Sequence, residues 1–354
     1  MSNMLRQQDS NRSLLNWVLD FRSLNLDLEG EHRPVELCQH ISVCYSNLSL
    51  PSYDYGTNKV EVIKPSDIDI ERYVSSDSEY REIIKEFYYF VNNRLHKYVS
   101  GVYLIGSLAT LDYKKGWSDL DVFMVVKDSV VSDVKKLCEL RLLCLKAWSK
   151  FFLKITPLQH HGFITVVEKD ISSYSERYMP VIVLKNSLSL LKDSKPLKFR
   201  IRPSSIDYIS GLNHRSGLLK EAILFGEYKH HPKNGKYLES NFSNYKDNMY
   251  QFFCFANYVM MLPALFMSAI GNSCYKKDSF ILAKKYFTTE SWNIVEKMTF
   301  VRNNWEEKEG VNYRGNSIPE WVMDSIGKKY LEETSIFLDE ITKILNNQSN
   351  VRAR

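Results

Sequence analysis

The pattern of apolar and polar positions up to residue 200 predicts alternating helices and strands. Apolar residues recur at helical spacing over 77–98 and 132–152, which predicts two amphipathic helices. Three short apolar runs predict buried strands: VYLIG (102–106), DLDVFMVV (119–126) and HGFITVV (161–167). The order helix, strand, strand, helix, strand is typical of a small α/β domain.

Beyond the segment FRIRPSS (199–205), the pattern becomes almost entirely helical. It predicts helices at 204–225, 245–270, 279–287, 291–303 and 319–345. We therefore expect an α/β (α+β) domain with a small mixed sheet at 76–200, followed by an all-helical domain at 201–354. Residues 1–75 mix a short amphipathic stretch with loop-like sequence, and we interpret them as an N-terminal extension to which the sequence assigns no role.

Composition and charge narrow the class of protein only slightly. Of the 354 residues, 44% are hydrophobic and 25% are charged, as in ordinary globular proteins, and the net charge of +5 permits a polyanionic partner without requiring one. The six cysteines form no CxxC pair and the first residues are polar, which predicts a cytoplasmic protein. The most apolar stretch, 252–270, is interrupted by Asn257 and Pro263, so we interpret it as a buried helix and expect no membrane association.

Two aspartates stand at alternate positions where the second predicted strand begins. Asp119 and Asp121 would point to the same face of a strand, and two adjacent carboxylates repel each other unless a cation lies between them. Upstream, the first strand ends in Gly106 and Ser107, where free amides and a hydroxyl can hold phosphate oxygens. An isolated D-x-D is more often an exposed turn, but this combined spacing favours a metal and phosphate site.

Gly106-Ser107 followed by Ser118-Asp119-Leu120-Asp121 resembles the signature of the nucleotidyltransferase superfamily, which has the polymerase-beta-like fold. That superfamily includes aminoglycoside nucleotidyltransferases, CCA-adding and poly(A) enzymes, oligoadenylate-synthase-like cyclases and the minimal nucleotidyltransferases of toxin–antitoxin pairs. The resemblance implies that Asp119 and Asp121 hold Mg²⁺, or Mn²⁺ in its place, and that Gly106, Ser107 and Ser118 contact a nucleoside triphosphate such as ATP. It further implies transfer of a nucleoside monophosphate to an acceptor hydroxyl with release of pyrophosphate.

The chain departs from the superfamily at the third carboxylate, which the next strand usually supplies. The run HGFITVVEKD (161–170) carries no acid at its early and middle positions, and His160 and His161 stand where it begins. Three possibilities stay open. His160 or His161 could be the catalytic base, and a histidine ligand would suit Mn²⁺ better than Mg²⁺. Glu168, at the far end, could reach the site, or the third ligand is lost and the domain binds nucleotide or RNA without turnover.

The helical half offers a second set of basic residues. Lys276 and Lys277 resemble the lysines that the superfamily's helical domain contributes to the triphosphate, although a solvated surface pair is equally compatible with the pattern. We expect Gly271 to end the preceding helix and Asp278 or Ser279 to begin the next one.

Basic and acidic segments of the chain bear on the identity of the acceptor. Three basic segments favour RNA, such as a tRNA-like 3′ end: Lys114-Lys115, 195–202 (KPLKFRIR) and 229–236. A small polycationic acceptor of the aminoglycoside kind would instead require an acidic pocket, which Glu306, Glu307 and Glu309 could furnish. The resemblance is also compatible with a regulatory protein partner.

Overall fold

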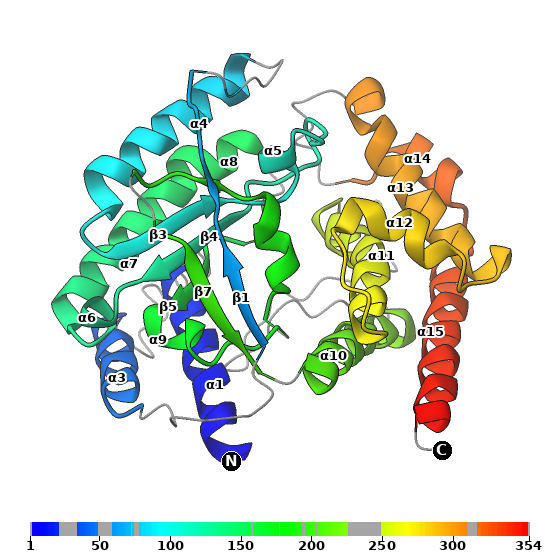
Figure 1. Cartoon of the computed structure of the whole chain (residues 1–354). Helices are drawn as coiled ribbons and strands as arrows, with labels where there is room; N and C mark the ends of the chain where they lie inside the picture. The colour runs from blue at the N-terminus through cyan, green and yellow to red at the C-terminus, as the bar shows by residue number, and fades with distance from the viewer. Residues whose placement is uncertain are drawn as a thin grey trace. The chain divides into compact units, whose positions relative to one another are not determined.

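The protein is mixed α/β and divides into two compact units (Figure 1). The computed structural model describes residues 2–20, 34–48, 59–71, 73, 78–156, 159, 161–176, 178–192, 195–202, 204–225, 249–309 and 317–352. The first unit comprises Met1–Ser175 and Val183–Pro203, and the second comprises Glu176–Ile182 and Ser204–Arg354. The small sheet lies in the first unit, and the C-terminal helices form most of the second.

A mixed five-stranded sheet forms the centre of the first unit. Its strands, in spatial order, are β2 (Ser66–Asp67), β6 (Leu188–Ser189), β3 (Val99–Leu104), β4 (Val122–Val126) and β5 (Ile164–Val167). Strand β3 runs antiparallel to β4, with Leu104 opposite Val122, and β4 runs parallel to β5, with Phe123 opposite Ile164. The end of β3 and the starts of β4 and β5 therefore meet at one edge of the sheet.

The central strand β4 is shorter than the sequence predicts. All five of its residues are buried, as expected for an apolar run covered on both faces. The predicted strand 119–126 is three residues shorter at its start, where the Leu120 amide bonds to the Gln159 side chain. Asp119 and Asp121 consequently lie in the loop that leads into β4.

Helices of the expected kind pack on this sheet. The predicted helix 77–98 is α4 (Ser78–Phe90) followed by a π-helical turn (Val91–Leu95). The predicted helix 132–152 is α7 (Val134–Ala147) followed by a second π-helical turn (Trp148–Phe152) and α8 (Leu153–Ile155).

An aromatic cluster joins these helices to the strand that follows His161. The ring of Phe87 lies 5.2 Å from that of Phe151, 5.9 Å from that of Phe152 and 6.1 Å from that of Phe163, measured between centroids. All four side chains are buried. Apolar packing therefore fixes the start of β5 against helix α4 and the second π-helical turn.

The N-terminal residues belong to the same compact unit as the sheet, whereas the sequence predicts an extension. Helices α1 (Ser2–Leu19) and α3 (Pro34–Ser46) bury Leu15 and Ile41 in its core. The Asn16 amide donates to the Thr165 carbonyl at 2.7 Å and accepts from the Thr165 N–H at 2.7 Å, so it satisfies backbone groups on the outer side of strand β5. This segment thus contributes to the sheet that carries the site.

The remaining elements of the first unit are short or peripheral. Strands β1 (Lys59–Ile63) and β7 (Leu197–Ile201) form a separate antiparallel pair, which the sequence pattern does not predict. Three short helices follow individual strands or turns: α5 (Gly106–Thr110), α6 (Asp128–Val131) and α9 (Glu168–Ile171).

The second unit consists largely of helices near the predicted positions. They are α10 (Ser204–Phe225), α11 (Met249–Ala269), α12 (Lys276–Lys284), α13 (Thr289–Glu309), α14 (Glu320–Ile326) and α15 (Tyr330–Arg352). The predicted single helix 319–345 is two helices, separated at Gly327, whose φ of +74° cannot continue a right-handed helix.

Two local predictions in this unit can be compared with the structure. Gly271 has φ +88°, and the following Asn272 N–H donates to the Met267 carbonyl at 2.8 Å, which is the expected cap at the end of α11. Helix α12 begins at Lys276 with Tyr275 as its N-cap, so the predicted caps, Asp278 or Ser279, lie inside the helix.

Among the described residues, one helical window, Gln251–Ala269, is long and apolar enough to cross a bilayer, and 78% of it is buried inside the protein.

Candidate metal centre

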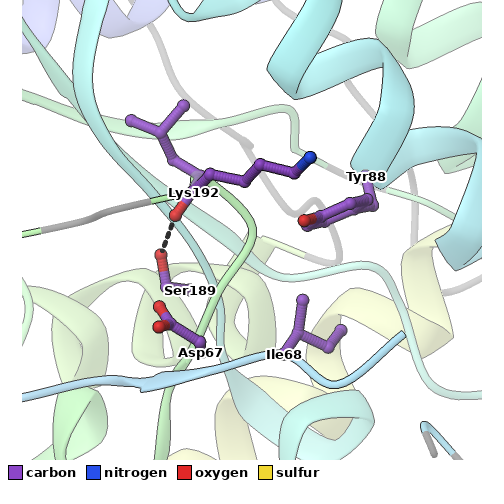
Figure 2. Close-up of a pocket in the computed structure, with 6 residues that line it drawn as sticks. Asp67, Ile68, Tyr88, Ser189 and Lys192 are labelled. Atoms are coloured by element: carbon purple, nitrogen blue, oxygen red, sulfur yellow. Dashed lines mark hydrogen bonds between the residues drawn. The ribbon is translucent and has the colours of Figure 1, made fainter. Parts of the chain in front are cut away.

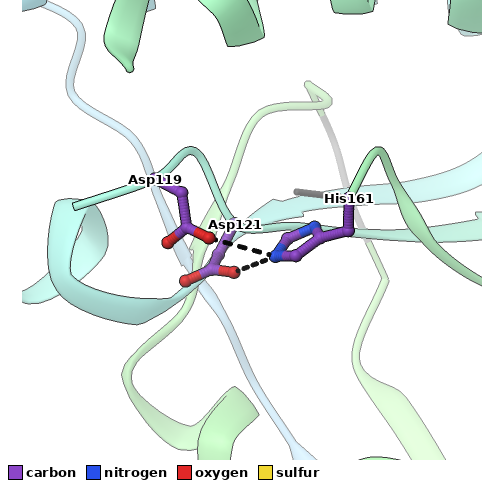
Figure 3. Close-up of side chains that lie close together, drawn as sticks. All are labelled: Asp119, Asp121 and His161. Carbon is purple, nitrogen blue, oxygen red and sulfur yellow. Dashed lines mark ion pairs between the residues drawn. The ribbon is translucent and has the colours of Figure 1, made fainter. Parts of the chain in front are cut away.

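Three side chains that can bind a metal ion converge at the edge where β3, β4 and β5 meet. Figure 3 shows the His161 ring directed at both carboxylates, with Nε2 3.3 Å from Asp119 Oδ2 and 3.1 Å from Asp121 Oδ1. One ligand atom of each residue lies within 4.8 Å of the others. The side chains of Asp119, Asp121 and His161 are 18%, 25% and 21% exposed, so the cluster is partly accessible to solvent.

The other nitrogen of His161 fixes which atom faces the carboxylates. Nδ1 lies 2.9 Å from the Gly162 carbonyl oxygen, which can only accept a hydrogen bond, so Nδ1 carries a proton. Burial lowers the pKa of His161, but the hydrogen bonds and charges of Asp119 and Asp121 raise it by more, and the pKa lies well above its ordinary value. Without a cation, a proton on Nε2 bridges the two carboxylates; a metal ion can replace that proton.

Gln159 ties the two loops of the centre together. Its side-chain oxygen accepts from the Leu120 N–H at 2.9 Å, and its amide nitrogen donates to the Leu120 carbonyl at 3.3 Å and to the His161 carbonyl at 2.7 Å. The side chain is buried, so these bonds are shielded from water. Because Leu120 stands between the two aspartates, Gln159 holds both of them in register with His161. The sequence pattern assigns no role to Gln159, since a glutamine before a predicted strand looks like an ordinary loop residue.

A second polar anchor comes from the N-terminal helix region. Asp20, which follows α1 and is buried, accepts a hydrogen bond from the Gly162 N–H at 2.9 Å. Both backbone groups of Gly162 are therefore engaged, the carbonyl by the His161 ring and the N–H by Asp20. Asp20 belongs to the segment to which the sequence assigns no role, and no local pattern marks it.

The predicted Gly106 lies directly against Asp121. Its φ is +67°, and a Cβ placed on it would lie 2.3 Å from Asp121 Oδ2, so both the backbone angle and the available space require glycine here. The Ile105 N–H also donates to the Asp121 carbonyl at 3.0 Å. Asp121 thus presents one carboxylate oxygen to His161 and the other to the Gly106 turn, with Ser107 next along the chain.

The structure does not bring Ser118 and Glu168 into this cluster. Ser118 is buried, and its hydroxyl accepts from the Lys114 N–H at 2.9 Å, so it closes the turn before the aspartates. Glu168 begins α9 beyond the far end of β5 and accepts from the Asp128 N–H at 3.0 Å. The five residues of β4, a length of about 17 Å, separate that end of the sheet from Asp121. The second predicted histidine, His160, lies outside the described residues.

The remaining predicted residues lie in different surroundings. Lys276 and Lys277 form the first turn of α12 in the second unit. In the predicted basic segment 195–202, Lys198 and Arg200 are exposed, whereas Arg202 is buried and bonds to Asp9 at 3.3 Å. The basic segment 229–236 lies outside the described residues.

The acidic residues proposed for a polycationic acceptor lie on α13. Glu306 and Glu307 are exposed, and Glu309 accepts a hydrogen bond from the indole N–H of Trp321 at 2.5 Å. The Glu309 carboxylate is therefore engaged within the helical unit itself.

A pocket of about 190 Å³ lies beside strands β2 and β6 (Figure 2). Its lining residues are Asp67, Ile68, Tyr88, Ser189, Leu191 and Lys192. The Ser189 hydroxyl donates to the Leu191 carbonyl at 2.9 Å, which holds the turn beside the pocket. These residues differ from those of the Asp119–Asp121–His161 cluster.

Comparison of the chain with protein-family models, with curated proteins and with solved structures gives no match.

Proposed function

We propose that this protein is a metal-dependent nucleotidyltransferase, which moves a nucleoside monophosphate from a nucleoside triphosphate to an acceptor hydroxyl. The observation that carries the proposal is the juxtaposition of the Gly106 turn with Asp121, at the place where Asp119 and His161 also meet. A metal centre for phosphate chemistry needs oxygen ligands beside a backbone turn that can approach phosphate oxygens closely. Residues from three separate loops supply both features at one edge of the sheet.

Each residue has a defined task in this reaction. Asp119 and Asp121 hold the ion, and the amides of Gly106 and Ser107 bind phosphate oxygens. A bound divalent ion supplies positive charge that offsets the charge of the triphosphate as its bonds rearrange. The acceptor oxygen forms a bond to the α-phosphorus while the bond from that phosphorus to the bridging oxygen breaks. Pyrophosphate leaves with that oxygen, and the hydroxyl proton passes to solvent water.

The geometry favours His161 over Glu168 in the place of the missing third carboxylate. Nε2 of His161 points at both aspartates, whereas Glu168 lies beyond the far end of β5 and bonds to Asp128. The position of this nitrogen supports a centre with three ligands over a domain that has lost the third one.

We further propose RNA as the acceptor, supported by the outer face of the β1–β7 pair. Lys198 and Arg200 are exposed there, while the alternate residues of β7 are buried. Strand alternation puts both cations on one face, where they can follow a phosphate backbone. A small polycationic acceptor is less supported, because Glu309 is engaged by Trp321.

Nucleotide transfer tests the main proposal. The protein is incubated with each of the four labelled nucleoside triphosphates, total RNA and either Mg²⁺ or Mn²⁺, and both labelled RNA and released pyrophosphate are measured. The double variant Asp119→Asn, Asp121→Asn should lose both signals. The control variant Glu168→Gln, whose substitution lies at the far end of β5 from the site, should keep them. Transfer by the double variant would refute the assignment. Tight triphosphate binding without pyrophosphate release, over all acceptors, would favour a silent binding module.

The RNA proposal has its own measurement. RNA affinity should fall steeply between low and moderate salt, and the double variant Lys198→Ala, Arg200→Ala should reduce the slope of log affinity against log salt by about 1.4 for single-stranded RNA. An RNA affinity of the unaltered protein that does not change with salt would instead favour a small-molecule acceptor.

A further inference from the structure

We propose that the centre formed by Asp119, Asp121 and His161 binds a transition-metal ion of the Mn²⁺ type in preference to Mg²⁺, with Nε2 of His161 as a ligand. The inference deepens the proposed function and rests on it for the role of the ion. It concerns the ion's identity and the atom that binds it, and both can be measured without any transfer reaction.

The donor set differs from the one that Mg²⁺ prefers. Mg²⁺ takes oxygen ligands in near-ideal octahedral geometry and gives up its water reluctantly. Imidazole nitrogen suits transition-metal ions, while carboxylate oxygen suits Mg²⁺, Ca²⁺ and Mn²⁺ alike. A set of two carboxylates and one imidazole therefore suits Mn²⁺, a transition-metal ion that also takes carboxylate oxygen, better than it suits Mg²⁺. A neutral imidazole in place of a third carboxylate also removes one negative charge, which weakens the attraction for a hard ion such as Mg²⁺.

The ring of His161 is oriented before any ion arrives. The Gly162 carbonyl accepts from Nδ1 at 2.9 Å, so the lone pair of the neutral ring is on Nε2. Such a bond from the second ring nitrogen is the usual support of a metal-binding histidine, and it fixes both tautomer and direction. Asp20 holds the Gly162 N–H at 2.9 Å and Gln159 holds the His161 carbonyl at 2.7 Å, so both polar groups of the peptide bond between His161 and Gly162 are restrained.

The site also has room for the rest of an octahedral shell. The three side chains are between 18% and 25% exposed, so solvent reaches the cluster. Waters or phosphate oxygens can complete the coordination there, which suits an oxygen-rich octahedral ion such as Mn²⁺.

Metal titration of the metal-free full-length protein tests the proposal. Free aqueous Mn²⁺ is followed by electron paramagnetic resonance, and Mg²⁺ affinity is obtained by competition. We expect Mn²⁺ to bind at least tenfold more tightly than Mg²⁺. His161→Glu should lower the ratio of Mn²⁺ affinity to Mg²⁺ affinity at least tenfold. His161→Ala should weaken Mn²⁺ binding by at least about tenfold, because loss of an outer-shell partner alone already costs that much. His96→Ala, an exposed histidine in the turn after the first π-helix, is the matched control and should change neither affinity.

A spectroscopic measurement identifies the ligand atom. In protein labelled with ¹⁵N-histidine, the electron spin echo of bound Mn²⁺ should show nitrogen coupling, which His96→Ala keeps and His161→Glu loses. Circular dichroism and thermal unfolding establish that each variant is folded. Equal affinities for the two ions in the unaltered protein, or nitrogen coupling that persists in His161→Glu, would overturn the inference.

The outcomes of this test and of the transfer assay are independent. Nitrogen-coupled Mn²⁺ with no nucleotide transfer would leave this inference standing and remove the proposed function. Transfer supported by Mg²⁺, with no nitrogen coupling to Mn²⁺, would do the reverse.

Discussion

Gly106→Ala is the substitution whose effect follows most directly from the geometry of the site. The new Cβ would lie 2.3 Å from Asp121 Oδ2, where ordinary contact begins at 3.4 Å, so the carboxylate has to move by about 1 Å. Metal–ligand distances are held within about 0.2 Å, and a displacement of this size takes Asp121 out of position. We expect the affinity for Mn²⁺ to fall at least tenfold.

The same substitution carries a separate cost in stability. Gly106 has φ +67°, and a side chain in this left-handed region costs about 1–2 kcal/mol. Gly271→Ala is the matched control, because Gly271 has φ +88° and no heavy atom lies within 4 Å of its added Cβ. The control should lose about the same stability and keep its affinity for Mn²⁺.

The assay is Mn²⁺ titration followed by electron paramagnetic resonance, together with urea unfolding of both variants. The reasoning is refuted if folded Gly106→Ala binds Mn²⁺ as the unaltered protein does. It is refuted equally if Gly271→Ala loses as much affinity, because backbone strain alone would then account for the loss.

Two further substitutions test how the site and the core are held. Gln159→Leu leaves the buried N–H and carbonyl of Leu120 without their partner. We expect the free energy of unfolding in urea to fall by about 3 kcal/mol and the Mn²⁺ affinity to fall about 10–100-fold. Unchanged affinity would show that the hydrogen bonds of Gln159 do not position the ligands. Asp170→Ala removes the acceptor of the Val167 N–H and the Tyr45 hydroxyl, and should cost about 2–3 kcal/mol. Burial raises the pKa of Asp170, so its contribution to the free energy of unfolding is fully present below the unfolded pKa of about 3.9 and falls as pH rises through the folded pKa. The stability lost in the variant should therefore be larger at pH 4 than at pH 7. The opposite trend would contradict this.

The elements that the sequence predicts well are those with a long, regular apolar pattern. Helix α10 has the predicted bounds, 204–225, and α4 begins one residue inside the predicted start. Helix α3 is as long as α4, with 13 residues, but its apolar positions form a weaker stripe, and strand β1 has only 5 residues, so neither is recognised from the pattern. The break at Gly327 is missed because one glycine does not interrupt the apolar stripe on either side of it, although its positive φ ends α14.

The sequence alone marks the parts of the candidate site that lie close together along the chain. Asp119, Asp121 and Gly106 stand out because acids at alternate positions before an apolar run, with a glycine at the end of the preceding strand, are unusual in a purely structural role. Their spacing in the chain already indicates the chemistry, because a cation or a proton between two adjacent carboxylates offsets their repulsion.

Only the tertiary structure decided what completes that pair. Pairing of β4 with β5 puts His161 beside the aspartates and leaves Glu168 at the far end of the sheet. The supports are equally non-local: Gln159 reaches Leu120 across 39 positions, and Asp20 reaches Gly162 across 142. A linear pattern records which residues share a face of one element, whereas these contacts depend on which strands pair, in what register, and which buried polar groups then need partners.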